Sequence, residues 1–200
     1  ALFVDDQLIV HNDSKSVSDL INDMNKRFEI SDLGNPERIL GMRVRRNENG
    51  DSIWIDQTAY IEELSKTFNI NDSKDRFQLP FTSGADTTHT YSPTTPEECR
   101  LMDDIPYAKL VGSLLWVATR TRPDISQVVG VLCRYMQKPG LGHWNMAKRV
   151  LHYLIETKDL ALHFKKSSAK PTIVGYVDSD FANDAHTRKS VTGVMKLRWI

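Results

Sequence analysis

The sequence lacks most of the features that mark a specialised class of protein. Its two cysteines, Cys99 and Cys133, lack the spacing typical of a disulfide framework, so we expect reduced thiols. The six histidines have no cysteine partners, which argues against a structural zinc site. Basic and acidic residues number 26 each, so nucleic-acid binding, if it occurs, must come from local patches. Without a membrane-spanning run or a secretion signal, we expect an intracellular protein with no membrane partner.

Two adjacent carboxylates stand near the start of the chain between two short apolar runs. Asp5 and Asp6 follow residues 2–4 and precede residues 8–10, a pattern that predicts a β-hairpin with the carboxylates at its tight turn. Because neighbouring carboxylates repel, a cation such as Mg²⁺ would stabilise them, and this ion prefers a few carboxylates plus substrate phosphates. On these residues alone, an ordinary polar turn is the better interpretation, since aspartate is a common turn former.

The next part of the chain alternates helical and hairpin patterns. Apolar spacing predicts an amphipathic helix over residues 16–28, with Ser16 as its N-cap. Residues 38–56 predict a second hairpin with a two-residue Asn49-Gly50 turn, and residues 57–68 a second helix. Gly41 either lets a phosphate approach the main chain or marks a bulge in a plain strand.

From residue 80 the pattern changes. Threonine, serine, aspartate and proline dominate residues 80–105, which predicts a linker. Helical patterns that begin at Pro106, at Asp124 and near His143 predict a small bundle. Three strands are expected after it, at residues 160–164, 173–180 and about 190–200, and the second ends in carboxylates on one face.

Several segments resemble one known family, in the same order. Phe3-Val4-Asp5-Asp6 resembles the Tyr/Phe-X-Asp-Asp box of reverse transcriptases, and the chain as a whole resembles the copia-type retrotransposon polymerase. Ile39-Leu40-Gly41-Met42 is similar to the primer grip, and residues 111–116 are similar to a thumb helix. Thr121-Arg122-Pro123-Asp124-Ile125 and His143-Trp144 match copia-type signatures, and residues 173–180 resemble the first strand of RNase H.

This resemblance implies an α+β fold in four parts. They are a partial reverse-transcriptase palm of antiparallel hairpins and helices over residues 1–79, the linker over 80–105, a thumb-like helical bundle over 106–169, and the first strands of an RNase H-like domain over 170–200. The resemblance also implies Mg²⁺ as cofactor, an RNA/DNA template-primer duplex as partner, and deoxynucleotides as substrates of the intact enzyme. The expected compartments are the cytoplasm, virus-like particles or the nucleus.

The same resemblance implies roles for individual residues. Asp5, Asp6 and Asp178 are expected to be catalytic metal ligands, the first two in the polymerase and the third in RNase H. A structural interpretation stays open as well: Trp116 and Trp144 could be core side chains, and the basic residues of this half could form a solvated face. The residues expected to bind nucleic acid are Leu40, Gly41, Met42, Gly112, Trp116, Arg120 and Arg122, and a wider phosphate-binding stripe would add Arg134, Lys138, Lys148 and Arg149.

Two functional classes remain open at this point. In the first, the chain is a piece of an RNA-directed DNA polymerase; it is expected to be inactive alone, because further metal ligands of both sites have no counterpart in these 200 residues. In the second, it is a degenerate transposon remnant that binds nucleic acid or a partner without catalysis. A third, remote alternative is an unrelated α/β domain. Phe3 replaces the commoner tyrosine of the box, which leaves the carboxylate chemistry intact.

Overall fold

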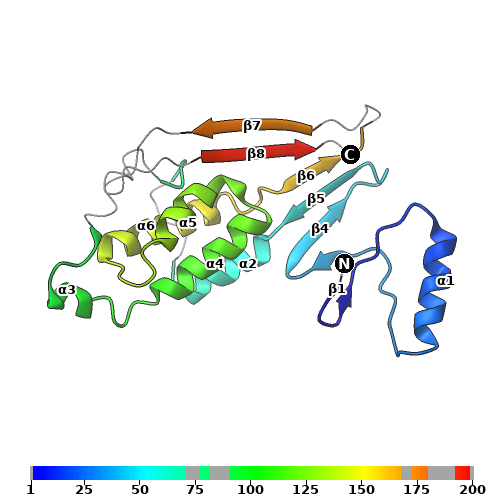
Figure 1. The fold of residues 1–200 in the computed structure, drawn as a ribbon, viewed down its shortest axis with the longest axis horizontal. Helices are drawn as coiled ribbons and strands as arrows, with labels where there is room; N and C mark the ends of the chain where they lie inside the picture. The colour runs from blue at the N-terminus through cyan, green and yellow to red at the C-terminus, as the bar shows by residue number, and fades with distance from the viewer. Residues whose placement is uncertain (1, 71–76, 82–90, 168–172, 180–191, 199–200) are drawn as a thin grey trace. The chain divides into compact units, whose positions relative to one another are not determined.

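The computed structural model describes residues 2–70, 77–81, 91–167, 173–179 and 192–198 (Figure 1). The chain divides into two compact units, Ala1–Pro36 and Glu37–Ile200. Both units combine helices with antiparallel strands. The α+β class expected from the sequence is therefore confirmed.

The first unit is a hairpin followed by one helix. Strands β1 (Leu2–Phe3) and β2 (Asp6–Gln7) pair antiparallel, and helix α1 spans Ser14–Asn25. The predicted N-cap is wrong: the side chain of Asp13, not Ser16, accepts hydrogen bonds from the first backbone N–H groups of the helix. None of residues 2–36 is buried, so this unit has no core of its own.

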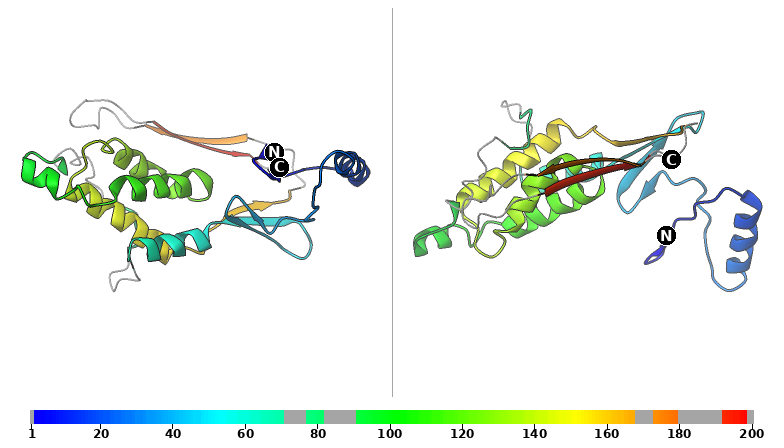
Figure 2. Two further views of the ribbon diagram at one scale, coloured as in Figure 1. Left: turned by 90° about the horizontal axis from the view of Figure 1, so that it is seen from below. Right: turned by 45° about the horizontal axis from the view of Figure 1, so that its top comes forward.

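The second unit contains a four-stranded antiparallel sheet (Figures 1 and 2). Its strand order is β3-β4-β5-β6, so the last strand comes from a segment about one hundred residues farther along the chain. The β5–β6 pairing thus joins the hairpin segment to the segment that follows α6. The strands are β3 (Arg38–Ile39), β4 (Met42–Arg46), β5 (Ser52–Asp56) and β6 (Leu162–Lys165).

The predicted hairpin is confirmed over residues 42–56, where β4 pairs with β5, but its first arm is divided by a turn between β3 and β4. Its predicted two-residue Asn49-Gly50 turn is also wrong. The Asn47 N–H donates to the Ser52 carbonyl at 3.2 Å, and the Gly50 N–H donates to the Asn47 carbonyl at 3.1 Å. Residues 48–51 therefore form a longer loop around an ordinary turn, with Gly50 in the left-handed region at φ +67°. The side chain of Asn47 favours this loop, because its amide donates to the Asp51 carboxylate at 2.6 Å.

Four helices of the second unit share one apolar core. Helix α2 packs on α6, and α4 packs on both α5 and α6. Ile61 and Leu64 of α2 are buried in this core, so a helix that the sequence analysis grouped with the palm packs with the thumb-like bundle. The predicted helices are confirmed as α2 (Thr58–Thr67), α4 (Tyr107–Arg120), α5 (Ser126–Cys133, after the 3-10 turn η2, Pro123–Ile125) and α6 (Leu141–Glu156).

The predicted linker contains a short helix. Helix α3 (Pro96–Arg100) begins after Thr95, whose side chain accepts from the Glu98 N–H, while the Glu98 carboxylate accepts from the Thr95 N–H. This is a capping box with proline in the first turn, and both are visible in the sequence.

Two further strands form a separate hairpin. Strands β7 (Ile173–Ser179) and β8 (Thr192–Arg198) pair antiparallel from Ile173 opposite Arg198 to Ser179 opposite Thr192. The two strands predicted here are confirmed; Asp180, which was expected at the end of the first, lies outside the described residues. In the part of the chain that the structure describes, no helix has the length and apolar character needed to span a bilayer.

Candidate functional site

The hairpin that carries Asp5 and Asp6 has a two-residue turn. Phe3 pairs with Asp6, so Val4 and Asp5 form the turn itself. Val4 adopts φ +48°, a left-handed conformation that is unusual for a β-branched residue. Such strained residues cluster at functional sites. Asp6 begins the returning strand, and both carboxylates are exposed.

The chemistry of this hairpin fits a magnesium ion. Mg²⁺ is usually held by one or two carboxylates together with water and substrate phosphates. Asp5 and Asp6 supply two such carboxylates on adjacent residues. Among the described residues, no cluster of three or more histidine, cysteine, aspartate or glutamate side chains could hold a metal ion. Two carboxylates could supply only part of the shell of six ligands that this ion prefers.

The primer-grip-like segment is also a two-residue hairpin turn. Ile39 pairs with Met42, and the turn residues Leu40 and Gly41 have φ values of +50° and +77°. Positive φ at both central residues is the signature of the hairpin turn that matches strand twist, and glycine suits it. Gly41 is thus neither in a bulge nor in a plain strand. A Cβ built at Gly41 meets nothing within 4 Å, so the backbone at this turn is accessible.

Three predicted nucleic-acid contacts lie along one face of helix α4. Gly112, Trp116 and Arg120 follow one another at four-residue spacing. Gly112 and Arg120 are exposed, and Trp116 is half-buried. The guanidinium of Arg120 lies over the Trp116 ring, 4.4 Å from its centroid. The structure therefore brings an aromatic ring and a cation together beside an open glycine.

Arg122 is placed differently. Its side chain is 2% exposed, and its Nη2 lies 2.7 Å from a carboxylate oxygen of Asp124. The same guanidinium donates to the carbonyl and hydroxyl oxygens of Thr157 at 2.9 and 2.7 Å. Asp124 also accepts from the Tyr153 hydroxyl at 2.8 Å. These contacts use the guanidinium inside the protein, so Arg122 does not offer its charge to a phosphate at the surface.

These neighbours lower the pKa of the Asp124 carboxylate. Burial would raise its pKa, but the hydrogen bonds and charge of Arg122, together with the Tyr153 hydroxyl, hold the pKa below its usual value. The Thr-Arg-Pro-Asp signature thus joins the end of α4 to the end of α6.

The His143-Trp144 signature is structural as well. His143 is fully buried, and its Nδ1 accepts a hydrogen bond from the Gly140 N–H at 3.0 Å, at the start of α6. Its ring stacks on Tyr135, with centroids 4.0 Å apart. Trp144 is half-buried, with its ring 6.3 Å from that of Phe68. Both side chains therefore stabilise the helical core.

The remaining predicted site residues lie apart from these clusters. Lys148 and Arg149 of the wider stripe are half-buried, and their cations lie over the rings of Trp144 and Phe77 at 5.7 and 4.7 Å. Arg134 and Lys138 are exposed beyond α5. Asp178 is exposed on β7, opposite Gly193.

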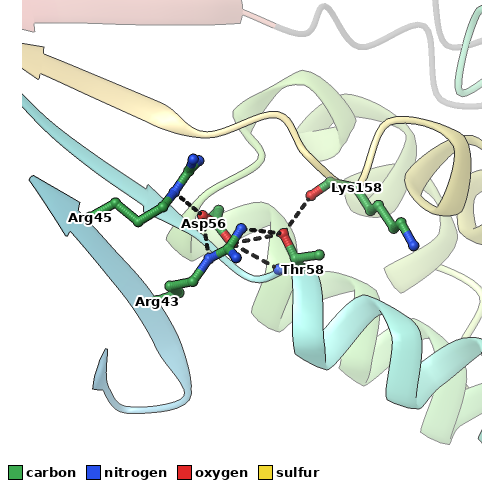
Figure 3. Close-up of polar contacts among 5 residues, drawn as sticks. All are labelled: Arg43, Arg45, Asp56, Thr58 and Lys158. Carbon is green, nitrogen blue, oxygen red and sulfur yellow. Dashed lines mark hydrogen bonds and ion pairs between the residues drawn. The ribbon is translucent and has the colours of Figure 1, made fainter. Parts of the chain in front are cut away.

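Sequence reasoning missed a charge cluster at the end of β5 (Figure 3). Asp56 is fully buried, and its carboxylate lies 3.1 Å from Arg43 Nε and 3.3 Å from Arg45 Nε. The Thr58 N–H and hydroxyl lie 3.2 and 2.8 Å from the same carboxylate, and the hydroxyl is also 2.9 Å from the Lys158 carbonyl. Burial would raise the pKa of Asp56, yet the hydrogen bonds from Thr58 and Arg43 lower it.

The signal for this cluster was present in the sequence. Arg43 and Arg45 alternate with Val44 in a predicted strand, which places both arginines on one face. Asp56 stands two residues before a threonine at the start of a helix, a position at which a carboxylate meets unpaired backbone N–H groups.

Comparison with known proteins identifies the family. A family model described as reverse transcriptase (RNA-dependent DNA polymerase) matches residues 1–81. The chain is 38% identical to the retrovirus-related Pol polyprotein from transposon TNT 1-94 of Nicotiana tabacum, over 97% of the chain and 14% of the polyprotein. It is 32% identical to a putative transposon Ty5-1 protein of Saccharomyces cerevisiae, over 84% of the chain and 52% of that protein.

A third relative is covered more fully. The chain is 30% identical to an uncharacterized mitochondrial protein of Arabidopsis thaliana, over 96% of the chain and 75% of that protein. No solved structure gives a significant match. The chain thus spans a small part of the tobacco polyprotein and about half of the yeast protein. These matches show that the chain belongs to the reverse transcriptase family found in the Pol polyproteins of copia-type retrotransposons.

Proposed function

We propose that the chain is part of an RNA-directed DNA polymerase in which Asp5 and Asp6 hold magnesium at the site of nucleotide transfer. The observation that carries this proposal is the turn at Val4 and Asp5, which presents both carboxylates to solvent through a strained backbone in a chain of this family. Two adjacent, solvent-facing carboxylates suit the task, because Mg²⁺ is usually bound by one or two carboxylates together with substrate phosphates.

The roles of the residues follow from their chemistry. The bound metal ions would activate the primer hydroxyl and stabilise the leaving pyrophosphate. Asp5 and Asp6 contribute charge and oxygen ligands and do not react themselves. Phe3, opposite Asp6 in the hairpin, keeps the aromatic ring of the box without the hydroxyl of tyrosine.

We further propose that two separate elements bind the template-primer duplex. The turn at Leu40 and Gly41, with Met42 beside it, offers accessible backbone to the primer. Along α4, Gly112, Trp116 and Arg120 offer a ring and a cation to the sugar-phosphate backbone. These contacts are independent of base sequence, so affinity should fall as salt rises.

The finer division of the chain is part of the same proposal. Residues 1–79 would belong to the palm, 80–105 to a linker, and 106–169 to a thumb-like region. Residues 170–200 would begin an RNase H-like domain, with Asp178 as a metal ligand. The exposure of Asp178 on β7 supports that role.

Primer extension by the polyprotein that contains this chain tests the proposal. We expect magnesium-dependent incorporation of deoxynucleotides on an RNA template. Asp5→Asn should abolish it, and Asp19→Asn, a matched loss of an exposed carboxylate on α1, should leave it unchanged. Full activity in Asp5→Asn would overturn the assignment. An inactive wild-type polyprotein that still binds the duplex would favour the transposon-remnant alternative.

A further inference from the structure

One face of the four-stranded sheet gathers cations around a pair of aromatic rings. Residues directly opposite each other in an antiparallel sheet lie on the same face. Arg45 is opposite Trp54, and Trp54 is opposite His163. The same alternation adds residues two positions away on each strand. We define the basic sheet face as Arg38, Arg43, Arg45, Trp54, His163 and Lys165.

The rings on this face form a flat stack. Trp54 and His163 lie with their ring centroids 4.7 Å apart and their planes 1° from parallel. His163 is exposed, and its strand β6 is at the edge of the sheet order β3-β4-β5-β6. The side of the imidazole that faces away from Trp54 therefore points past the sheet edge. A further planar group could continue the stack there.

The charge of this face is positive after its internal ion pairs are counted. The single buried carboxylate of Asp56 is shared by Arg43 and Arg45, whose side chains remain 43% and 46% exposed. Figure 3 shows dashed lines that join Asp56 to both arginines. Arg38 and Lys165 are exposed on the same face, although Asp51 lies near Lys165. Glu62 lies near Arg43 but is paired with Lys158. The four cations of the face therefore exceed the two other nearby carboxylates, Asp51 and Asp56, which suits an anionic partner.

We propose that the basic sheet face binds single-stranded nucleic acid, with Arg38, Arg45 and Lys165 at phosphates and His163 stacked on a base. This inference rests on the proposed function, because it takes the partner to be a nucleic acid. A phosphate backbone with planar bases matches the combination of cations and rings. A single strand fits better than a duplex, since its bases are free to leave their own stack.

The buried Asp56 acts on this surface as a positioning residue. By accepting a hydrogen bond from Arg43 and forming an ion pair with Arg45, its carboxylate limits the rotamers of both arginines before any ligand arrives. Thr58 and the Lys158 carbonyl tie the same cluster to α2 and to the segment after α6. Cations ordered in this way lose less side-chain entropy on binding.

The test is fluorescence anisotropy of the full 200-residue chain with a labelled single strand of about 15 deoxythymidines, across a salt series. Arg38→Gln and Lys165→Gln should each weaken binding and reduce the salt slope by about one. His163→Ala should weaken binding about fivefold and leave the salt slope unchanged, because it removes stacking and no phosphate contact. Arg45 and Trp54 are left intact in these variants because they pair within the sheet.

Arg46→Gln is the matched control. Arg46 is the next residue on the same strand, but it is opposite Ile53 and so belongs to the other face of the sheet. We expect its affinity to change by about twofold or less. Equal losses in Arg46→Gln and Arg38→Gln would show non-specific attraction and overturn the inference. Displacement by polyglutamate with no effect of His163→Ala would point to an acidic protein partner and also overturn it.

The design separates this inference from the proposed function. If Trp116→Ala weakens duplex binding while the sheet-face variants bind the single strand normally, only the inference fails. If the polyprotein stays active in Asp5→Asn, only the metal assignment fails. Circular dichroism of each variant confirms that the fold is retained, so a loss of affinity reports the surface itself.

Discussion

Arg122 is a basic residue within a family signature, and yet its guanidinium is buried and paired inside the protein. Asp124 and Thr157 accept hydrogen bonds from its N–H groups. Its guanidinium also lies 5.3 Å from the centre of the Tyr153 ring. A guanidinium is needed for this arrangement, since an ammonium group cannot donate in a planar fork. Sequence alone did not reveal this burial, because the partner Thr157 is 35 residues away along the chain.

Arg122→Lys should therefore destabilise the second unit by about 2 to 3 kcal/mol, since charged hydrogen bonds are lost in a buried site. Urea unfolding followed by circular dichroism measures this. Arg100→Lys, a change at an exposed arginine on α3, serves as control and should cost about 0.5 kcal/mol or less. A loss of nucleic-acid affinity in Arg122→Lys with unchanged stability would contradict the structural role.

Asp56 makes the stability of the folded protein depend on pH. Its pKa is lowered in the folded protein, because hydrogen bonds from Thr58 and Arg43 outweigh the effect of burial. A carboxylate of this kind contributes stability that is fully present above its unfolded pKa of about 3.9 and is lost as pH falls through the folded value. Protonation at low pH should therefore mimic the removal of the charge.

Asp56→Asn should lower the free energy of unfolding by about 2 to 3 kcal/mol at pH 7, and by less near pH 3, because the unfolded chain then takes up a proton at this carboxylate. Urea titrations at both pH values test this. Glu63→Gln, at an exposed position on α2, should have little effect at either pH. An equal loss at both pH values would show that Asp56 acts through packing rather than charge.

At the scale of elements, periodicity predicted which segments form helices and strands but not how every turn closes. Helices α2, α4 and α6 were visible because their apolar residues recur at helical spacing. Asn49-Gly50 carried the expected sequence of a two-residue turn, yet the Asn47 side chain favours a longer loop. The turn at Leu40 and Gly41 was missed, since leucine rarely adopts positive φ.

Helix α4 offers the sharpest test of the proposed duplex surface. Trp116 is half-buried beneath the Arg120 guanidinium, so its removal should expose no core residue but should take away the ring that positions this cation for the sugar-phosphate backbone. We expect Trp116→Ala to weaken binding of a primer-template duplex about tenfold. Leu115→Ala, which removes an exposed apolar side chain from the same helix, is the control. Unchanged affinity in Trp116→Ala, with the fold intact, would reassign Trp116 to packing.

At the scale of the whole molecule, burial is concentrated in the helical part. The apolar side chains with no exposed surface all lie in helices or in the 3-10 turn of the second unit, whereas residues 2–36 bury no side chain. The sequence predicted the helical bundle as a core, but it could not show that α2 joins it. That contact depends on Ile61 and Leu64 meeting α6, nearly ninety residues away, and local periodicity carries no such pairing information.

The local stability of each element against opening should follow this distribution of burial. Strands β7 and β8 pair along seven residues each, but Tyr176, Val177 and Val194 are exposed on them. A two-stranded hairpin with exposed apolar residues is marginal in water, because it offsets little of the entropy lost on ordering. Amides of β7 and β8 should therefore exchange hydrogen much faster than those of α4 and α6, whose opening approaches global unfolding.

Native-state hydrogen exchange of the 200-residue chain measures this difference residue by residue. The hairpin that carries Asp5 and Asp6 should exchange quickly too, since its unit lacks buried residues. Amides of β4 and β5 serve as an internal reference, because they pair on both sides within the four-stranded sheet. Protection of β7 and β8 equal to that of α4 would mean that the C-terminal hairpin belongs to a stable core, and the proposal that residues 170–200 only begin an RNase H-like domain would fail with it.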